Sequence, residues 1–121
     1  MLITIDAASN EPLFTQVAAA IRAQIATGEA RPGDRLPPAK DLASGLGVNV
    51  HTVLHAYQEL RDEGLVDLRR GRGAVVTEAA DGVARLQRDI AELGRRAADL
   101  GMSPATVAAL VRTSMGGTAP N

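Results

Sequence analysis

Three arginines lie within four positions of one another, together with two glycines, in the run Arg69, Arg70, Gly71, Arg72 and Gly73. A guanidinium group stays charged at neutral pH and binds phosphate oxygens through several N–H donors, and glycine lets a backbone approach a ligand closely. The β-rich runs on either side, residues 65–68 and 74–77, predict a β-hairpin with a basic tip. Such a tip would neutralise DNA phosphates or enter a minor groove. The alternative is an exposed hairpin whose arginines serve solubility alone.

A second group of polar side chains falls on one face of a helix predicted over residues 49–64. Asn49 suits the N-cap of this helix, and Gly64 suits its C-terminal stop. Its predicted inward face consists of Val53, Ala56, Tyr57 and Leu60. The capped N-terminus and the outward face then offer contacts to DNA, and the candidates are Asn49, Val50, His51, Thr52, Leu54, His55 and Gln58. The alternative is a plain solvated helix surface, which the neighbouring basic hairpin disfavours.

Other chemistry finds little support in the chain. His51 and His55 have the i, i+4 spacing that brings two imidazoles onto one helix face, but no zincin glutamate follows His51 and the chain has no cysteine. The serines have no nearby His–acid constellation, and the glycines match no nucleotide-binding pattern. We therefore expect no metal, no cofactor and no enzyme activity.

The predicted elements place both groups in one fold. Apolar spacing predicts a first helix over residues 12–27 and a short second helix over residues 39–46, followed by a tight turn at Gly47. Short strands are expected over residues 2–5 and 34–36. Two helices joined by a glycine turn and followed at once by a hairpin indicate a winged helix-turn-helix. The fold class is therefore mainly α with a small β-hairpin wing, and the DNA-binding domain spans residues 1–78.

Residues 79–121 have a different pattern. Apolar residues with alternating spacings of 3 and 4 form a heptad seam on one long helix, and the seam comprises Val83, Leu86, Ile90, Leu93, Ala97 and Leu100. Ser103 and Pro104 begin a further short helix before a frayed tail. The seam either packs on the chain's own winged domain or pairs with a second copy. We favour a dimerisation segment of two C-terminal helices, because a dimer places two reading helices about one turn of duplex apart.

Composition limits where a DNA-binding surface can lie. The chain of 121 residues fits one small domain with a short appendage, and no stretch predicts a signal peptide or a membrane span, so we expect a cytoplasmic protein. Thirteen basic and 14 acidic residues give a net charge of −1. Any nucleic-acid binding must therefore come from a local basic patch. The near absence of aromatic residues argues against base stacking with single strands.

These motifs resemble the GntR family of bacterial transcription regulators over about two-thirds of the chain. The matching stretches are residues 12–16, 32–37, 42–43, 46–49, 52–53, 56–57, 63–66 and 70–73. The short helical tail is similar to that of the YtrA-type subfamily, whose members lack a large effector domain and dimerise through C-terminal helices. The resemblance implies a homodimeric repressor on an inverted-repeat operator, often beside genes for an ABC transporter, with a small-molecule effector of unknown identity.

The resemblance also carries over individual residues. Lys40 occupies the place of an arginine that is usual in the second helix of the family. The resemblance implies that this side chain contacts DNA. Many members carry arginine where this chain has Val50 and Leu54, so guanine readout from those positions is lost and apolar contact with thymine methyl groups becomes possible.

The sequence thus predicts a homodimeric, sequence-specific DNA-binding repressor that reads an inverted repeat through helix 49–64 and clamps the flanking backbone with its basic wing. The alternative from another class is a winged-helix module that binds protein and not DNA, which the net negative charge favours slightly. An enzyme ranks third.

Overall fold

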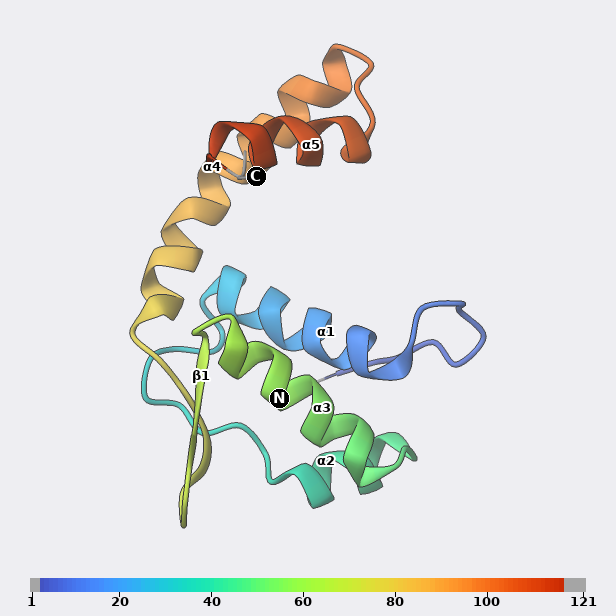
Figure 1. The fold of residues 1–121 in the computed structure, drawn as a ribbon, viewed down its shortest axis with the longest axis vertical. Helices are drawn as coiled ribbons and strands as arrows, with labels where there is room; N and C mark the ends of the chain where they lie inside the picture. The colour runs from blue at the N-terminus through green and yellow to red at the C-terminus, as the bar shows by residue number, and fades with distance from the viewer. Residues whose placement is uncertain (1–2, 117–121) are drawn as a thin grey trace. The chain divides into compact units, whose positions relative to one another are not determined.

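The computed structural model describes residues 3–116, which form two compact units, one ending at Arg85 and one beginning at Leu86. The elements in chain order are α1 (Leu13–Thr27), α2 (Ala39–Leu46), α3 (Val50–Asp62), β1 (Val66–Arg69), β2 (Gly73–Val76), α4 (Ala79–Asp99) and α5 (Pro104–Ser114) (Figure 1). The predicted winged helix-turn-helix with two further C-terminal helices is confirmed.

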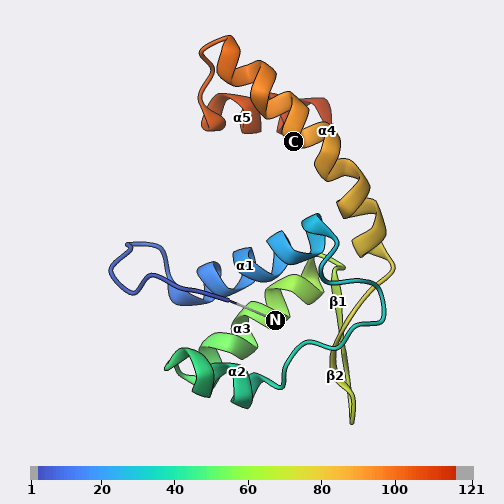
Figure 2. The same ribbon diagram turned by 180° about the vertical axis from the view of Figure 1, so that it is seen from behind.

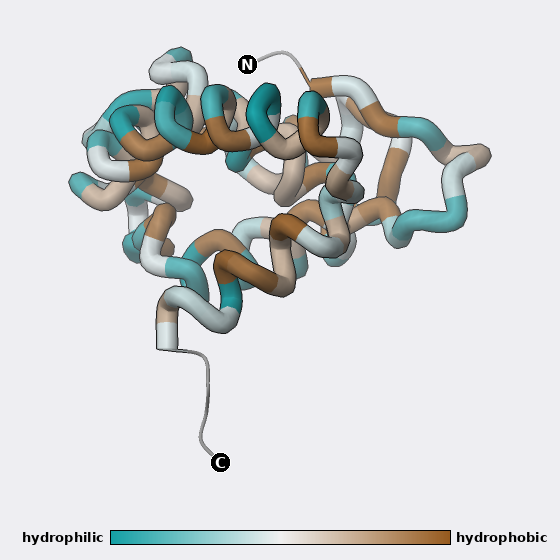
Figure 3. The backbone as a smooth tube through the Cα atoms, turned by 90° about the horizontal axis from the view of Figure 1, so that it is seen from above, coloured by the Kyte–Doolittle hydropathy of each residue, from teal (hydrophilic) through white to brown (hydrophobic). Residues whose placement is uncertain are grey.

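The winged unit is built on α1, whose buried residues Val17, Ile21 and Ile25 recur every fourth position. Gly28 ends α1 in a left-handed conformation (φ 85°), which costs glycine little because it has no Cβ. The turns of the helical segments carry both hydrophobic and hydrophilic positions (Figure 3), as expected for helices that bury one side. The residues of α1 therefore supply one wall of the core.

Helices α2 and α3 form the helix-turn-helix. Gly47 turns the chain between them with φ 70°, and Asn49 caps α3 through its side-chain oxygen, which accepts from the His51 N–H at 2.7 Å. The predicted inward face of α3 is confirmed, because Val53, Ala56, Tyr57 and Leu60 are all buried.

The wing is an antiparallel hairpin in which Val66 pairs with Val76 and Arg69 with Gly73 (Figure 2). The segment before α2 lies along the free edge of β2. The Gly33 N–H donates to Val76 O at 2.8 Å, the Val76 N–H to Asp34 O at 2.8 Å, and the Leu36 N–H to Ala74 O at 2.9 Å. The strand predicted over residues 34–36 is thus reduced to one bridge between Arg35 and Val75, since prolines on both sides supply no N–H donor for a longer ladder.

The strand predicted over residues 2–5 is wrong for its described part, and Leu2 lies outside the described residues. Residues 3–5 pair with no strand, and Ile3 is buried in the core of the winged unit. An alternating apolar pattern is typical of a strand, but it also occurs in an irregular segment that buries one side chain in the core.

The second unit is a helical hairpin in which α5 folds back alongside α4 (Figures 1 and 2). Gly101 (φ 77°) lies in the turn, the Met102 N–H donates to Ala97 O, and the Ser103 hydroxyl caps α5 by accepting from the Thr106 N–H at 3.2 Å. The first turns of α4 belong to the winged unit, where Ala80 is buried and Val83 packs against the core. No described helix is long and apolar enough to cross a membrane.

Candidate nucleic-acid interface

The outward face of α3 is open to solvent. His51, Leu54, His55 and Gln58 are exposed, and Val50 and Thr52 are half-buried. The capped N-terminus of a helix presents free backbone N–H groups and a partial positive charge, which favour a phosphate. Helix α3 therefore combines an anion-binding end with a row of side chains that project away from the core.

The two histidines of α3 have different surroundings. The His55 ring stacks on Phe14 of α1, with centroids 3.7 Å apart and an interplanar angle of 13°. No such ring contact holds His51 among the described residues, and no group of three potential metal ligands is found in residues 3–116. His51 is thus the more available of the two imidazoles for a groove contact.

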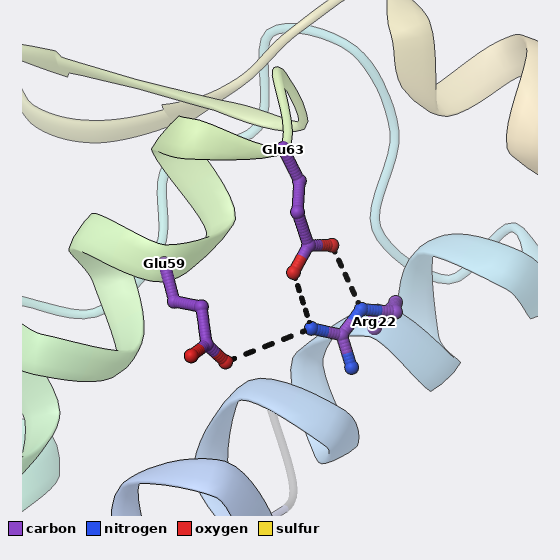
Figure 4. A network of polar contacts seen from close by, with 3 residues as sticks. All are labelled: Arg22, Glu59 and Glu63. Carbon is purple, nitrogen blue, oxygen red and sulfur yellow. Dashed lines mark hydrogen bonds and ion pairs between the residues drawn. The ribbon is translucent and has the colours of Figure 1, made fainter. Parts of the chain in front are cut away.

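Helix α3 is fastened to α1 at its C-terminal end (Figure 4). The Arg22 guanidinium donates to both carboxylate oxygens of Glu63, at 2.9 and 2.6 Å, and lies 3.9 Å from Glu59. These contacts raise the pKa of Arg22, mainly through the hydrogen bond to Glu63. All three side chains are more than a third exposed, so the contribution to folding stability is modest. The fork-like geometry joins the C-terminal end of α3 to α1 at two points.

The tip of the wing carries the three predicted arginines, and all are exposed. Arg69 pairs with Asp67 at 3.2 Å, whereas within residues 3–116 no ion pair engages Arg70 or Arg72. Gly71 and Gly73 have φ angles of 80° and 73°, and the Arg72 N–H closes the turn on Arg69 O at 3.1 Å. The glycines are therefore required by the shape of the turn, which projects Arg70 and Arg72 with their charges unpaired.

The outward face of α3 and the wing meet at an open pocket of about 390 Å³. Leu54 lines it from α3, and Arg69 and Arg70 line it from the wing, so predicted residues far apart in sequence are brought together. Its lining consists of Pro37, Pro38, Ala39, Leu54, Tyr57, Leu68, Arg69, Arg70, Gly73 and Ala74. Lys40 is exposed on the first turn of α2, outside this lining.

Sequence reasoning missed two residues of this surface. Leu68 is 39% exposed and lines the same pocket as Leu54; its place at the end of the run 65–68, directly before the arginines, was the available signal. Arg35 reaches the wing from the segment before α2, and its Nε–H donates to Arg72 O at 3.2 Å. Nothing in the pattern of residues 31–38 pointed to this long-range contact.

Some residues of the heptad seam are packed against other residues, and others are exposed to solvent. Val83 packs on the winged core and Ala97 is buried. The larger seam residues Leu86, Ile90, Leu93 and Leu100 are 42–73% exposed. The second unit adds further exposed apolar side chains, namely Met102, Leu110, Val111 and Met115. The apolar surface of the second unit is therefore wider than the predicted seam.

A family model described as "Bacterial regulatory proteins, gntR family" matches residues 13–76, from the start of α1 to the end of β2. The chain belongs to the GntR family. This match covers the helix-turn-helix and the whole wing, which are the elements that carry the interface described above.

Among GntR relatives, the HTH-type transcriptional repressor YtrA of Bacillus subtilis is 37% identical over 79 residues, which cover 65% of this chain and 61% of the relative. The structure of YtrA from Sulfolobus acidocaldarius, a GntR-family transcription factor, has a TM-score of 0.61 at 40% identity, covering 77% of this chain and 99% of that one. The DNA-binding domain of AraR, solved in complex with the operator ORX1, has a TM-score of 0.57 at 25% identity, covering 64% and 96%. The chain spans less than two-thirds of the length of the first curated relatives that it matches.

Proposed function

We propose that this protein is a homodimeric transcription repressor that binds an inverted-repeat DNA operator. In each subunit α3 enters the major groove, and the wing contacts the flanking phosphates. The role assigns no catalytic reaction and no cofactor, and it places the protein in the cytoplasm with the DNA that it binds.

One observation supports DNA binding above the others. The outward face of α3 and the arginine tip of the wing border the same pocket, through Leu54 on one side and Arg69 and the unpaired Arg70 on the other. A reading helix flanked by a basic arm matches the two kinds of contact that specific DNA recognition needs, one to base edges and one to phosphates. The operator complex of the related AraR domain supports the same role.

The homodimer is supported by the second unit. Its exposed leucines and methionines form an apolar surface of the kind that marks a protein interface. A two-fold dimer would read two half-sites about one helical turn apart. We include in this interface the seam residues Leu86, Ile90, Leu93, Ala97 and Leu100, with Val83 at its edge.

The individual DNA contacts follow from position. We assign phosphate contacts to Lys40, Thr52, Arg69, Arg70 and Arg72, with Gly71 and Gly73 allowing close approach. We assign groove contacts to Asn49, Val50, His51, Leu54, His55 and Gln58, and among these His55 through the ring edge left free by its stack on Phe14. Release of DNA by a small-molecule effector is an expectation from the resemblance alone.

The second candidate is a winged-helix module that binds protein and not DNA. It is favoured by the net charge of −1 and by the exposed Leu54 and Leu68 between α3 and the wing.

Fluorescence anisotropy of the purified protein separates the two candidates. The probes are a duplex from the upstream region of its own gene and a scrambled duplex of equal length, each titrated over a salt series. A repressor binds the upstream duplex tightly, with a steep salt dependence, and the scrambled duplex weakly. Absence of binding to either duplex at low salt would contradict the proposal and favour the protein-binding module.

A further inference from the structure

We propose that Arg35 is a positioning residue that holds the tip of the wing, residues 69–73, in the orientation that delivers Arg70 and Arg72 to DNA phosphates. The effect on phosphate contacts rests on the proposed DNA binding, whereas the contact by which Arg35 holds the tip is present in the free protein.

The backbone at Arg35 is firmly supported. The segment from Gly33 to Leu36 exchanges three backbone hydrogen bonds with β2, each 2.8–2.9 Å long. The next residue, Pro37, accepts a hydrogen bond at 2.6 Å from the hydroxyl of the buried Tyr57 on α3. The base of the Arg35 side chain is therefore fixed relative to the core and to the reading helix.

The tip of the wing needs such support. The backbone bonds between the segment before α2 and β2 reach toward the tip as far as the pair of Leu36 and Ala74. Beyond this pair the hairpin has only two strands, and two-stranded hairpins are marginally stable by themselves. The left-handed glycines Gly71 and Gly73 add conformational freedom at that point.

The Arg35 side chain contacts the part of the hairpin that has only two strands. Its Nε–H donates to the carbonyl of Arg72, 37 residues along the chain. The accepting peptide group lies between Arg72 and Gly73, so the hydrogen bond fixes the orientation of the turn that carries the arginines. Arg35 and Arg72 also line one open pocket of about 560 Å³ together with Pro37, Pro38 and Gly71.

A direct phosphate contact by the Arg35 guanidinium is the competing role, and two substitutions distinguish it from positioning. In Arg35→Gln the side-chain amide N–H₂ replaces the Nε–H donor at the same distance along the side chain, while the charge is lost. In Arg35→Lys the charge is kept, but a methylene stands where Nε was. Arg35→Ala removes both features.

The first readout is the salt dependence of duplex binding, measured by anisotropy on all four proteins. If Arg35 positions the tip, Arg35→Gln should keep the wild-type slope of log affinity against log salt. Arg35→Lys and Arg35→Ala should each lose the part of that slope that the wing's phosphate contacts contribute, about 2 per subunit. In the Arg35→Lys background, replacing Arg70 and Arg72 by alanine should then change the slope little. A wild-type slope in Arg35→Lys, together with a reduced slope in Arg35→Gln and Arg35→Ala, would make Arg35 a phosphate contact and overturn the proposal. A wild-type slope in all three variants would overturn it as well.

The second readout is amide hydrogen exchange in the free protein, which needs no DNA. The Arg72 amide, bonded to Arg69 O, should exchange faster in Arg35→Lys and Arg35→Ala but not in Arg35→Gln. The amides of Leu36 and Val76 and the melting temperature should be unchanged, because the bond is exposed and contributes little to global stability. Unchanged Arg72 exchange in every variant overturns the hold on the tip. If the wild type shows no salt-dependent DNA binding, the proposed function fails, while exchange still decides the role of Arg35.

Discussion

Tyr57 links the reading helix to the segment that supports the wing. Its ring is buried, with 3% of the residue exposed, and its hydroxyl donates to Pro37 O at 2.6 Å. Burial raises the pKa of the Tyr57 phenol above its ordinary value of about 10, because the phenolate would lose its hydration. At this single residue the position of α3 and the position of the turn before α2 become coupled.

The raised pKa of Tyr57 predicts a loss of folding stability at alkaline pH. The folded state keeps the phenol proton above pH ~10 while the unfolded state releases it, so the free energy of unfolding falls as pH rises, by up to about 1.4 kcal/mol per pH unit. Tyr57→Phe should lose about 0.5–1.5 kcal/mol at pH 7, because the hydrogen bond is gone, and should remove this alkaline component. Urea unfolding at pH 7 to 11 measures both effects.

The chain offers a direct check on the Tyr57 prediction. Tyr57 is the only tyrosine and the chain has no tryptophan, so phenolate absorbance reports this one group. Titration of the folded protein with a midpoint near 10 would contradict the assignment.

Leu54 supports a prediction about base readout. It is 38% exposed on the outward face of α3, where an apolar side chain favours the C5-methyl group of thymine. In a duplex selected from a random pool, replacing the contacted thymine by deoxyuridine removes one methyl group. The affinity should fall by about 0.8 kcal/mol, roughly fourfold, and Leu54→Ala should abolish the difference. Deoxyuridine outside the half-sites is the control, and an equal effect there would refute the contact.

At the scale of elements, the wing should account for part of the electrostatic attraction to DNA. Replacing Arg70 and Arg72 by alanine should lower the slope of log affinity against log salt by about 2 per subunit, since each phosphate contact that forms releases about 0.9 counterion and two such contacts are lost. Anisotropy over a salt series measures the slope. The matched control removes Arg88 and Arg95, two exposed arginines of α4 that lie opposite the heptad seam. Equal salt slopes for the two double variants would contradict phosphate contacts by the wing.

The helices were predictable because their signals are local. Apolar spacing, the Asn49 cap and the turn at Gly47 depend on neighbours within one or two helical turns, and α1 to α3 form within a residue or two of their predicted bounds. The hairpin was predictable for the same reason, since the glycines of the arginine run mark its tip.

Contacts over long sequence separations were not predictable. The bond from Arg35 to Arg72, the stack of Phe14 on His55 and the fork of Arg22 on Glu63 join residues 37 to 41 positions apart. No short-range pattern encodes such pairs, because each depends on how whole elements pack. The same limit explains the strand expected over residues 2–5, where alternation alone did not reveal the absence of a pairing partner.

At the scale of the molecule, the apolar surface of the second unit requires explanation. Leu86, Ile90, Leu93 and Leu100 keep 42–73% of their surface in contact with water in the single chain. Leaving large apolar side chains exposed forfeits about 25 cal/mol for each Å² that a partner would cover. A second copy would bury them through a symmetric contact, in which each residue meets the corresponding surface of the other subunit.

This explanation predicts that charges in the seam separate the subunits. Leu86→Glu with Leu93→Glu should yield monomers in light scattering, because an unpaired carboxylate is costly to bury. The winged unit has its own core, so the variant should still bind a single half-site as wild type does, while affinity for the two-site operator should fall to that level. Arg88→Glu with Arg95→Glu, on the opposite side of α4, tests for a general effect of added negative charge. A seam variant that remains dimeric would contradict the assigned interface, because no arrangement that buries Leu86 and Leu93 at the contact tolerates four carboxylates there.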